Sequence, residues 1–314
     1  MRTSRTVLVI GANGGIGREA CLALKRHGWQ VRALVRNLPV ELDGIEWIRG
    51  DAMQRDDVLA AAQGANAIVH AVNPAGYRNW GGLVLPMLDN TIAAAKATGA
   101  RIVLPGTIYN FGADAFPLVR EDSPQHPPTV KGEIRAEMER RLAEASRIGV
   151  RSLILRCGDF IGPHAGNNWF GQGLVQPGKQ VTTLRYPADY AHHHAWAYLP
   201  DVAETIALLL EREPELAAFA TYNFGGYWLD GHSIADAVRR VTNNPNIALR
   251  RFPWWLTALV APFMETLREL RKMRYLWKET IRLDDAKLVA FLGKQPYTPI
   301  DTALRTTLVG LGCM

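Results

Sequence analysis

The sequence predicts an α/β fold in which a doubly wound parallel sheet is covered by helices on both faces. Three observations support this prediction. Apolar runs alternate with amphipathic helical patterns through the first half of the chain, the first run (6–10) is apolar at nearly every position, and a glycine-rich turn follows it at once. Such alternation is typical of parallel strands joined by helical crossovers. A strand that is apolar on both sides needs cover on both faces of its sheet.

The hydrophobic periodicity defines each element in turn. We expect strands at residues 6–10, 30–35, 45–48, 67–71, 101–104 and 151–155, and helices at 16–27, 54–63, 83–98 and 130–147. The pattern then loosens, and residues 158–198, rich in Gly, Pro, His and Asn, are predicted to form a long irregular insertion. A helix at 201–212, a strand at 220–224 and a helix at 233–241 follow, and the chain from residue 247 is predicted to be helical.

A chain of 314 residues exceeds one typical domain. The regular alternation assigns residues 1–160 and 197–245 to a nucleotide-binding body. The remaining segments, 161–196 and 246–314, are predicted to form a smaller, mainly helical lobe that binds the substrate. Long loops in compact domains usually carry function, which is why the irregular segment is placed over the site.

Composition indicates an ordinary globular protein, because 48% of the residues are hydrophobic and 21% are charged. The net charge of +6 comes without a nucleic-acid motif and favours small anionic ligands. The apolar stretch at 252–264 is interrupted by two prolines and is shorter than the roughly 20 residues that span a bilayer. We therefore expect a small-molecule substrate, no nucleic-acid partner and no integral membrane segment.

The cysteines and histidines give no sign of a metal site. Cys21, Cys157 and Cys313 are widely separated and lack ligand spacing, and the three histidines at 192–194 have no carboxylate or thiol at a suitable distance along the chain. We therefore expect no metal. The odd number of cysteines, and an N-terminus that leads directly into the first strand, favour a cytoplasmic protein.

The glycine-rich turn is the strongest motif of the chain. It reads Gly11-Ala-Asn13-Gly14-Gly15-Ile16-Gly17, directly after the first predicted strand and at the start of the first predicted helix. Gly11 permits a tight turn, Gly14 lets backbone N–H groups approach a pyrophosphate, and Gly17 lets the helix pack near the strand. The anion then lies at the positive end of the helix. We expect a Rossmann-type dinucleotide site at this turn, with all of these residues except Ala12 in contact with the cofactor.

With its GxxGxxG spacing, the turn resembles that of the short-chain dehydrogenase/reductase superfamily, more closely its extended and atypical branch, which includes NAD-dependent epimerases and dehydratases. Further segments that resemble this branch are 156–163 (RCGDFIGP), 198–203 (YLPDVA) and 222–225 (YNFG). The resemblance spans nearly the whole chain. It implies a Rossmann-type fold and a nicotinamide dinucleotide. Dimers are frequent in this superfamily, so a homodimer is the oligomer that the resemblance suggests.

The second predicted strand indicates which dinucleotide is preferred. It ends in Arg36 and lacks the acidic residue that would bind a ribose 2′-hydroxyl, so NADP(H) is favoured over NAD(H). The resemblance implies that Asp51 and Ala52 hold the adenine ring and that Ala71 and Val72 line the adenosine ribose. It also places Lys131 and Cys157 beside the cofactor.

The catalytic residues implied by the resemblance are partly replaced in this chain. Thr107 matches the Ser or Thr that hydrogen-bonds the substrate oxygen. The Tyr-x-x-x-Lys pair of the superfamily corresponds to Lys131 and Arg135, which the four-residue spacing places on one helix face. Lys131 is therefore expected to be either the acid/base or a clamp for an anionic substrate, with Arg135 lowering its pKa. Tyr109, two residues from Thr107, is an alternative acid.

The predicted function is that of an NADP(H)-dependent oxidoreductase acting on a small or medium carbonyl, alcohol or activated double bond. Trp169, Phe170 and Trp196 are expected to form apolar walls around the substrate, and His193 to face it. Two alternatives stay open at this point. One is a nucleotide-sugar epimerase or dehydratase, and the other is a non-catalytic protein that senses NADP(H).

Overall fold

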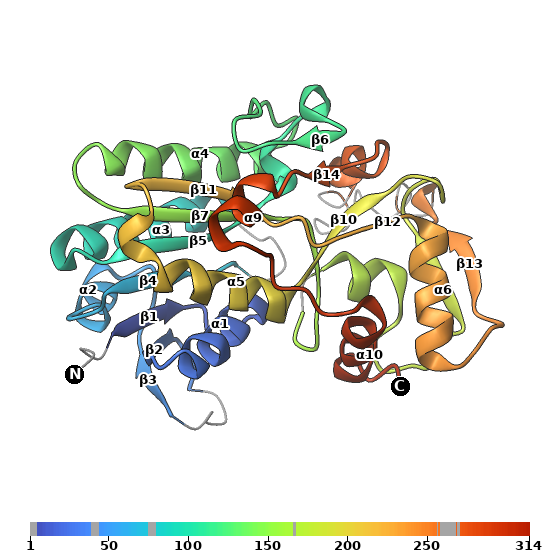
Figure 1. The fold of residues 1–314 in the computed structure, drawn as a ribbon, viewed down its shortest axis with the longest axis horizontal. Helices are drawn as coiled ribbons and strands as arrows, with labels where there is room; N and C mark the ends of the chain where they lie inside the picture. The colour runs from blue at the N-terminus through green and yellow to red at the C-terminus, as the bar shows by residue number, and fades with distance from the viewer. Residues whose placement is uncertain are drawn as a thin grey trace.

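A seven-stranded parallel sheet forms the centre of the molecule (Figure 1). The computed structural model describes residues 5–38, 44–74, 80–165, 168–255, 257, 268 and 271–314. The strand order is β11-β7-β5-β4-β1-β2-β3, and every neighbouring pair is parallel. The strands are β1 (Thr6–Ile10), β2 (Gln30–Val35), β3 (Ile45–Arg49), β4 (Ala67–His70), β5 (Arg101–Thr107), β7 (Ser152–Cys157) and β11 (Phe219–Asn223). The order reverses between β1 and β4, which creates a crevice at their carboxyl ends.

Helices cover both faces of this sheet, as the doubly wound prediction requires. On one face lie α1 (Gly15–Arg26) and α5 (Leu199–Glu211), whose apolar side chains share a core with Val7 and Val9 of β1. On the other face lie α2 (Arg55–Ala61), α3 (Trp80–Thr98) and α4 (Val130–Ser146), which share a core with Leu8 and Ile10. Alternate residues of β1 thus enter opposite cores, and the predicted α/β architecture is confirmed.

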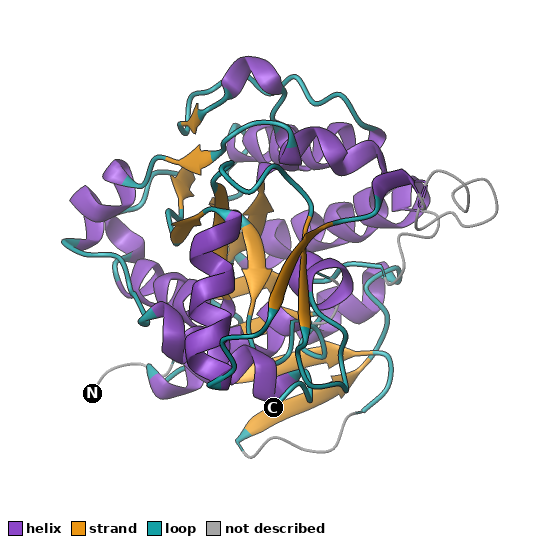
Figure 2. Ribbon diagram, turned by 90° about the vertical axis from the view of Figure 1, so that its right-hand side faces the viewer, coloured by secondary structure: helices purple, strands orange, loops and turns teal. Residues whose placement is uncertain are grey.

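The lobe beside the carboxyl ends of the strands contains short sheets that the sequence pattern did not reveal (Figure 2). Residues 158–198 are not simply irregular, because they include β8 (Asp159–Ile161), a π-helix (Phe170–Leu174), β9 (Thr183–Tyr186) and β10 (His194–Tyr198). The chain after residue 247 is also not purely helical, since β13 (Ala248–Arg251) pairs with β9, and β14 (Arg282–Leu283) pairs with β6 (Leu118–Val119). Tertiary pairing stabilises these short strands.

The chain passes repeatedly between the body and the lobe. After β11 it forms β12 (Tyr227–Leu229) and α6 (Gly231–Thr242), and α6 contributes Ile234 and Val238 to the core of the lobe. Next come the 3-10 turn Met273–Trp277 and α9 (Ala286–Leu292), whose Leu288 returns to the core of the body. The last helix, α10 (Ile300–Gly310), packs against α6. None of the described helices is long and apolar enough to cross a membrane, and most of the apolar stretch at 252–264 lies outside the described residues.

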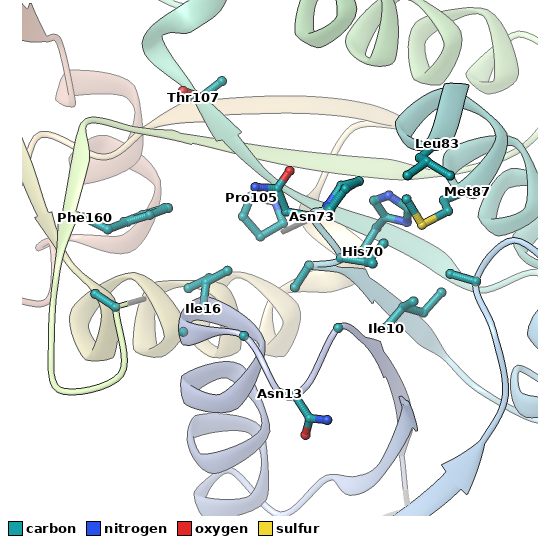
Figure 3. A pocket seen from close by; sticks show the side chains of 18 of the residues that line it. Ile10, Asn13, Ile16, His70, Asn73, Leu83, Met87, Pro105, Thr107 and Phe160 are labelled. Carbon is teal, nitrogen blue, oxygen red and sulfur yellow. The ribbon is translucent and has the colours of Figure 1, made fainter. Parts of the chain in front are cut away.

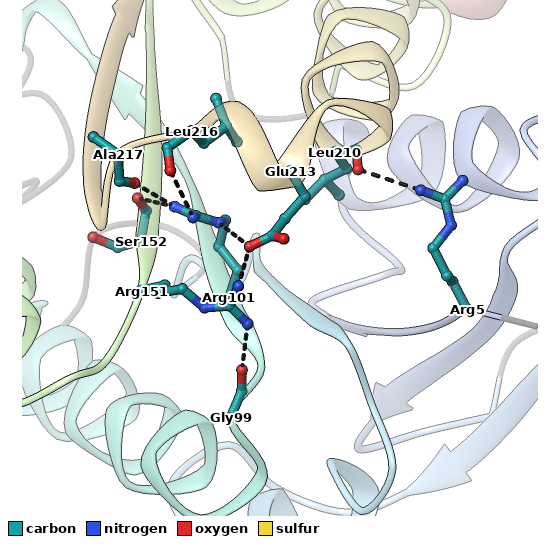
Figure 4. A network of polar contacts seen from close by, with 9 residues as sticks. All are labelled: Arg5, Gly99, Arg101, Arg151, Ser152, Leu210, Glu213, Leu216 and Ala217. Carbon is teal, nitrogen blue, oxygen red and sulfur yellow. Dashed lines mark hydrogen bonds and ion pairs between the residues drawn. The ribbon is translucent and has the colours of Figure 1, made fainter. Parts of the chain in front are cut away.

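A buried arginine ties together the amino ends of β5 and β7, at the edge of the sheet opposite the crevice (Figure 4). The Arg101 side chain is 1% exposed, and its Nε lies 3.0 Å from Oε1 of Glu213. The same guanidinium donates to the carbonyl oxygens of Ser152 and Ala217 at 3.0 and 2.8 Å. Arg151 also pairs with Glu213. Because its N–H groups are hydrogen-bonded and its charge is paired with Glu213, the Arg101 guanidinium is stabilised in this buried position.

Candidate functional site

A cavity of about 870 Å³ lies at the carboxyl ends of the parallel strands (Figure 3). Its floor includes the ends of β1, β4 and β5, so it occupies the crevice where the strand order reverses. Its residues come from the glycine turn, the ends of β2 and β3, helix α3 and the segment 158–172. Ligands of open α/β sheets bind at this position, and the volume is that of a pocket for a medium-sized organic ligand.

The glycine turn has the shape that the sequence predicted, although its glycines differ in what they touch. Gly11 has a φ of +89°, and a Cβ on it would lie 2.6 Å from the backbone nitrogen of Val72. A Cβ on Gly17 would lie 2.2 Å from the Gly11 carbonyl oxygen, so Gly17 permits the turn to close rather than the helix to approach the strand. A Cβ on Gly14 would meet only that same oxygen, at 3.3 Å. Gly14 therefore keeps the cavity open, while Gly17 is required by the turn.

The first turn of α1 is suited to an anion. Gly14 is its N-cap, no side chain caps the helix, and no acidic residue lies in its first turn. Gly14, Gly15 and Ile16 all line the cavity, whereas Gly17 does not. Because the first N–H groups of a helix lack partners within the helix and lie at its positive end, a phosphate group fits this wall of the cavity.

One end of the cavity lies at the carboxyl ends of β2 and β3 and is lined by Asn13, Arg36, Asp51 and Ala52. Arg36 is exposed, and within the described ranges no hydrogen bond or ion pair involves its guanidinium. The Asp51 carboxylate accepts a hydrogen bond from the Met53 backbone nitrogen at 3.0 Å, and the Asn13 amide donates to the Asn37 carbonyl oxygen at 3.3 Å. Ala71 and Val72, which follow β4, line the cavity between this end and the other.

The opposite end of the cavity brings together three of the predicted catalytic residues. Thr107, Tyr109 and Arg135 line it, and the Thr107 hydroxyl accepts a hydrogen bond from the Tyr109 backbone nitrogen at 3.3 Å. The hydroxyl therefore keeps its own hydrogen for another acceptor. The Arg135 guanidinium lies over the Trp80 ring, 5.1 Å from its centroid.

Lys131 lies one turn before Arg135 on α4 but does not line the cavity, and only 4% of it is exposed. The start of α4 is packed closely against the Thr107 loop, since a Cβ on Gly132 would lie 2.3 Å from the Tyr109 carbonyl oxygen. A buried ion pair between Arg156 and Glu139 (2.7 Å) fixes α4 to the end of β7. The four-residue spacing thus brings Arg135 to the cavity while Lys131 stays beneath its wall.

The aromatic residues that were expected to form apolar walls lie outside the cavity. Trp169, Phe170 and Trp196 are 5%, 0% and 1% exposed and belong to the core of the lobe, so they do not line the cavity. Phe160, Asn168 and Gln172 occupy this side of it instead. The His193 ring is stacked on Trp228 with the ring centroids 4.1 Å apart, away from the cavity.

Cys157 does not line the cavity either. The residue is 1% exposed, and burial raises the pKa of its thiol. Within the described ranges, no group of three or more His, Cys, Asp or Glu side chains could hold a metal ion.

Two polar features of the cavity, the buried His70 and the bond between Asp159 and His194, were not predicted from the sequence. His70, at the end of β4, is 2% exposed and lines the cavity, and its Nδ1 lies 2.8 Å from the Thr91 hydroxyl. Burial, together with the charge of Arg135, lowers the pKa of His70 to about 3, so the ring is neutral. Asp159 also lines the cavity and is hydrogen-bonded to His194, 35 residues away. Only the parallel pairing of β8 with β10 brings these two together, and no spacing in the sequence indicates it.

Comparison with known proteins agrees with this geometry. Residues 11–158 match the NAD(P)H-binding family. The N-terminal half is an NAD(P)H-binding domain. Two curated relatives also match: a 3-diazoavenalumate denitrifying reductase of a Streptomyces species, and a 2-alkyl-3-oxoalkanoate reductase of Stenotrophomonas maltophilia. The first is 30% identical over 178 residues, 51% of this chain, and the second 29% over 167 residues, 48% of this chain. The matched regions span 58% and 49% of those relatives.

Solved structures are similar in fold to nearly the whole of this chain. L-threonine dehydrogenase from Clostridium difficile superposes with a TM-score of 0.80 at 18% identity, covering 100% of both chains. UDP-N-acetylglucosamine 4-epimerase from Bacillus cereus gives a TM-score of 0.73 at 18% identity, covering 98% of this chain and 96% of the other. The chain therefore has the fold of the extended dehydrogenases and NAD-dependent epimerases.

Proposed function

We propose that this protein is an NADP(H)-dependent oxidoreductase that acts on a small or medium carbonyl, alcohol or activated double bond. The observation that carries the proposal is a single cavity that joins the glycine turn to the polar end formed by Thr107, Tyr109 and Arg135. The open space above Gly14 and the uncapped first turn of α1 fit a dinucleotide pyrophosphate. That the two curated relatives are named as reductases supports the same class of chemistry.

The side chains at the Thr107 end have the donors that such a reaction needs. The dinucleotide supplies or accepts the hydride. The Thr107 hydroxyl, whose oxygen already accepts a bond from Tyr109, donates to the substrate oxygen. Arg135 offers a permanent cation to a ribose hydroxyl or to an anionic substrate group. Because Arg135 lines the cavity and Lys131 does not, the proposal gives the ligand contact to Arg135 and leaves the acid/base role of Lys131 as a prediction.

Arg36 carries the preference for the phosphorylated dinucleotide. Its guanidinium lines the cavity at the ends of β2 and β3, none of the described lining residues at the end of β2 is a carboxylate, and a fork of donors fits a 2′-phosphate. We expect NADPH to bind at least several-fold more tightly than NADH, Arg36→Ala to remove the difference, and Arg36→Asp to reverse it. Titration of both dinucleotides measures this.

Arg49→Ala is the control, because Arg49 is exposed at the end of the next strand but does not line the cavity. Equal affinities of the wild type for both would refute the preference.

A substrate panel tests the reaction class. We expect absorbance at the reduced-nicotinamide band to fall when NADPH is mixed with a suitable carbonyl compound. Isomerisation of a nucleotide sugar without net consumption of cofactor would instead identify an epimerase. Tight dinucleotide binding without turnover of any compound in either panel would favour a sensor.

A further inference from the structure

The buried side chains of Asp159 and His194 are in contact, and the proposed reaction assigns no role to either of them. Nε2 of His194 lies 2.7 Å from Oδ2 of Asp159, and the two side chains are 2% and 6% exposed. The His194 ring is stacked on Trp277 with the centroids 3.8 Å apart, and Trp196 lies edge-on at 5.6 Å. Since the imidazole is held by two indole rings, it fixes the orientation of the carboxylate.

The second oxygen of this carboxylate faces the cavity. Oδ2 is bonded to His194, and no described residue bonds to Oδ1. Oδ1 is nevertheless not among the polar atoms that are buried without a partner, and Asp159 is a lining residue of the cavity. A ligand in the cavity can therefore reach Oδ1, although the residue is almost wholly enclosed.

The hydrogen-bond pattern of the pair makes the Asp159 carboxylate the acceptor at this position. His194 donates through Nε2, while its Nδ1 is buried and has no hydrogen-bond partner. A second proton on Nδ1 would be a buried donor without an acceptor, and it would add a charge to an apolar surrounding. The hydrogen-bond pattern therefore fits an imidazole that donates only through Nε2 to a carboxylate that accepts.

Asp159 lies at the end of the cavity opposite Arg36 and Asp51. In the register of β5 and β7, Thr107 pairs with Cys157, and Asp159 follows two residues later. A dinucleotide can bind with its pyrophosphate at the glycine turn and its adenosine at the ends of β2 and β3. Its nicotinamide then lies toward the end of the cavity that Asp159 lines. Arg135, from α4, also lines this end.

We propose that Asp159, oriented by His194, selects between the redox forms of the bound dinucleotide by favouring the oxidised one. The oxidised nicotinamide ring is cationic and the reduced ring is neutral, so a nearby carboxylate in a poorly hydrated site attracts the former and has little effect on the latter. This inference rests on the proposed dinucleotide function. It concerns the ratio of the affinities for the oxidised and the reduced dinucleotide. Arg135 is present in the wild type and in the Asp159 variants alike, so a change in this ratio is due to Asp159.

The experiment measures dissociation constants of NADP⁺ and NADPH by calorimetry for the wild type and for Asp159→Asn. We expect the variant to shift the ratio of the two constants by about fivefold toward NADPH. Asp51→Asn is the matched control, because Asp51 is a carboxylate that lines the other end, and it should leave the ratio unchanged even if both affinities fall. Asp159→Ser, which keeps an acceptor for His194, gives a second measurement if the Asn variant does not fold.

The outcomes separate this inference from the proposed function. A shifted ratio in the Asp159 variants but not in Asp51→Asn supports the inference. Binding of both redox forms with the wild-type ratio in Asp159→Asn or Asp159→Ser overturns it and leaves the dinucleotide function intact. A wild-type protein that binds neither form refutes the dinucleotide function itself, and the inference with it.

Discussion

Gly14 and Gly17 lie three residues apart in one turn, yet they meet different surroundings. Gly14 has an ordinary extended backbone (φ −86°, ψ 163°) and space above it, while Gly17 faces a carbonyl oxygen at a distance that no Cβ tolerates. Backbone atoms cannot move aside as the end of a flexible side chain can. A motif that sequence analysis treats as one unit therefore separates into a residue that binds and a residue that lets the turn form.

Substitutions at these two glycines should have opposite effects on stability and binding. We expect Gly14→Val to keep the unfolding free energy within about 1 kcal/mol and to weaken dinucleotide binding at least tenfold, since its side chain enters the cavity. Gly17→Ala should lower the unfolding free energy by about 2–4 kcal/mol, because the added carbon forces the turn apart. Urea unfolding and dinucleotide titration of both variants measure these effects. A Gly14→Val protein that binds normally would show that the pyrophosphate lies elsewhere.

At the scale of elements, the end of α1 is fastened to α5 by a histidine. His27 is the C-cap of α1, and its two ring nitrogens lie 2.8 Å from Glu211 and 2.6 Å from Glu204, both on α5. Burial by itself lowers the pKa of His27, but hydrogen bonds to the two carboxylates outweigh it and raise the pKa above 6.5. A cation at the C-terminus of a helix is also favoured by the helix dipole.

This contact predicts a pH-dependent contribution to stability. Because the pKa of His27 is higher in the folded chain than its ordinary value of 6.5, the stabilisation is fully present below pH 6.5 and is lost as the pH rises through the folded value. We expect His27→Gln to lower the unfolding free energy by up to about 1 kcal/mol at pH 6, and by less at pH 9. Urea unfolding at both pH values measures the difference.

The control for this prediction is His126→Gln. His126 is exposed and pairs with Asp114 near the surface, so its replacement should have a smaller effect at either pH. A His27→Gln deficit that is the same at pH 6 and pH 9 would contradict the protonated bridge.

The elements of the body and helix α6 could be predicted from the sequence, whereas the short strands of the lobe could not. The body strands are apolar runs buried on both faces, such as Thr6–Ile10 and Ser152–Cys157, so local composition defines them. In the lobe, β8 has three residues and β10 reads His-Ala-Trp-Ala-Tyr, and both depend on pairing with distant segments. The Asp159–His194 contact depends on that same pairing, which no local pattern encodes.

The same limit applies to the side chains of the site. The glycine turn, Arg36 and Thr107 line the cavity, and each has a fixed position in a motif next to a strand, so sequence analysis can select them as candidates. Large aromatic side chains often line pockets, which is why the sequence suggests Trp169 and Trp196 as walls of the substrate site, but such side chains also fill cores, and here they belong to the core of the lobe. Sequence alone does not say which of two buried surfaces an aromatic ring will join.

At the scale of the whole molecule, the reactivity of the buried thiols measures how often the folded chain opens around them. Cys21 and Cys157 lie in the core of the body, and Cys313 lies in the core of the lobe, three residues after the end of α10. Burial raises the pKa of Cys21 to about 12, so little reactive thiolate is present. We expect native-state alkylation to reach Cys313 first, by local opening of the segment that follows α10, and NADPH to slow labelling of Cys21 and Cys157. Mass spectrometry of the labelled peptides measures the order, and Cys21 reacting as fast as Cys313 would contradict it.

The position of β11 has a consequence for synthesis of the chain. The edge strand Phe219–Asn223 pairs with β7, Ser152–Cys157, which the ribosome completes more than sixty residues earlier. Until β11 emerges, β7 presents a row of unpaired backbone N–H and C=O groups on a strand whose residues are all buried in the finished fold. An open apolar edge is a template for pairing with other chains, so the nascent protein passes through an aggregation-prone interval. Its yield should therefore depend on how quickly residues 158–223 are translated and on the chaperones present during that interval.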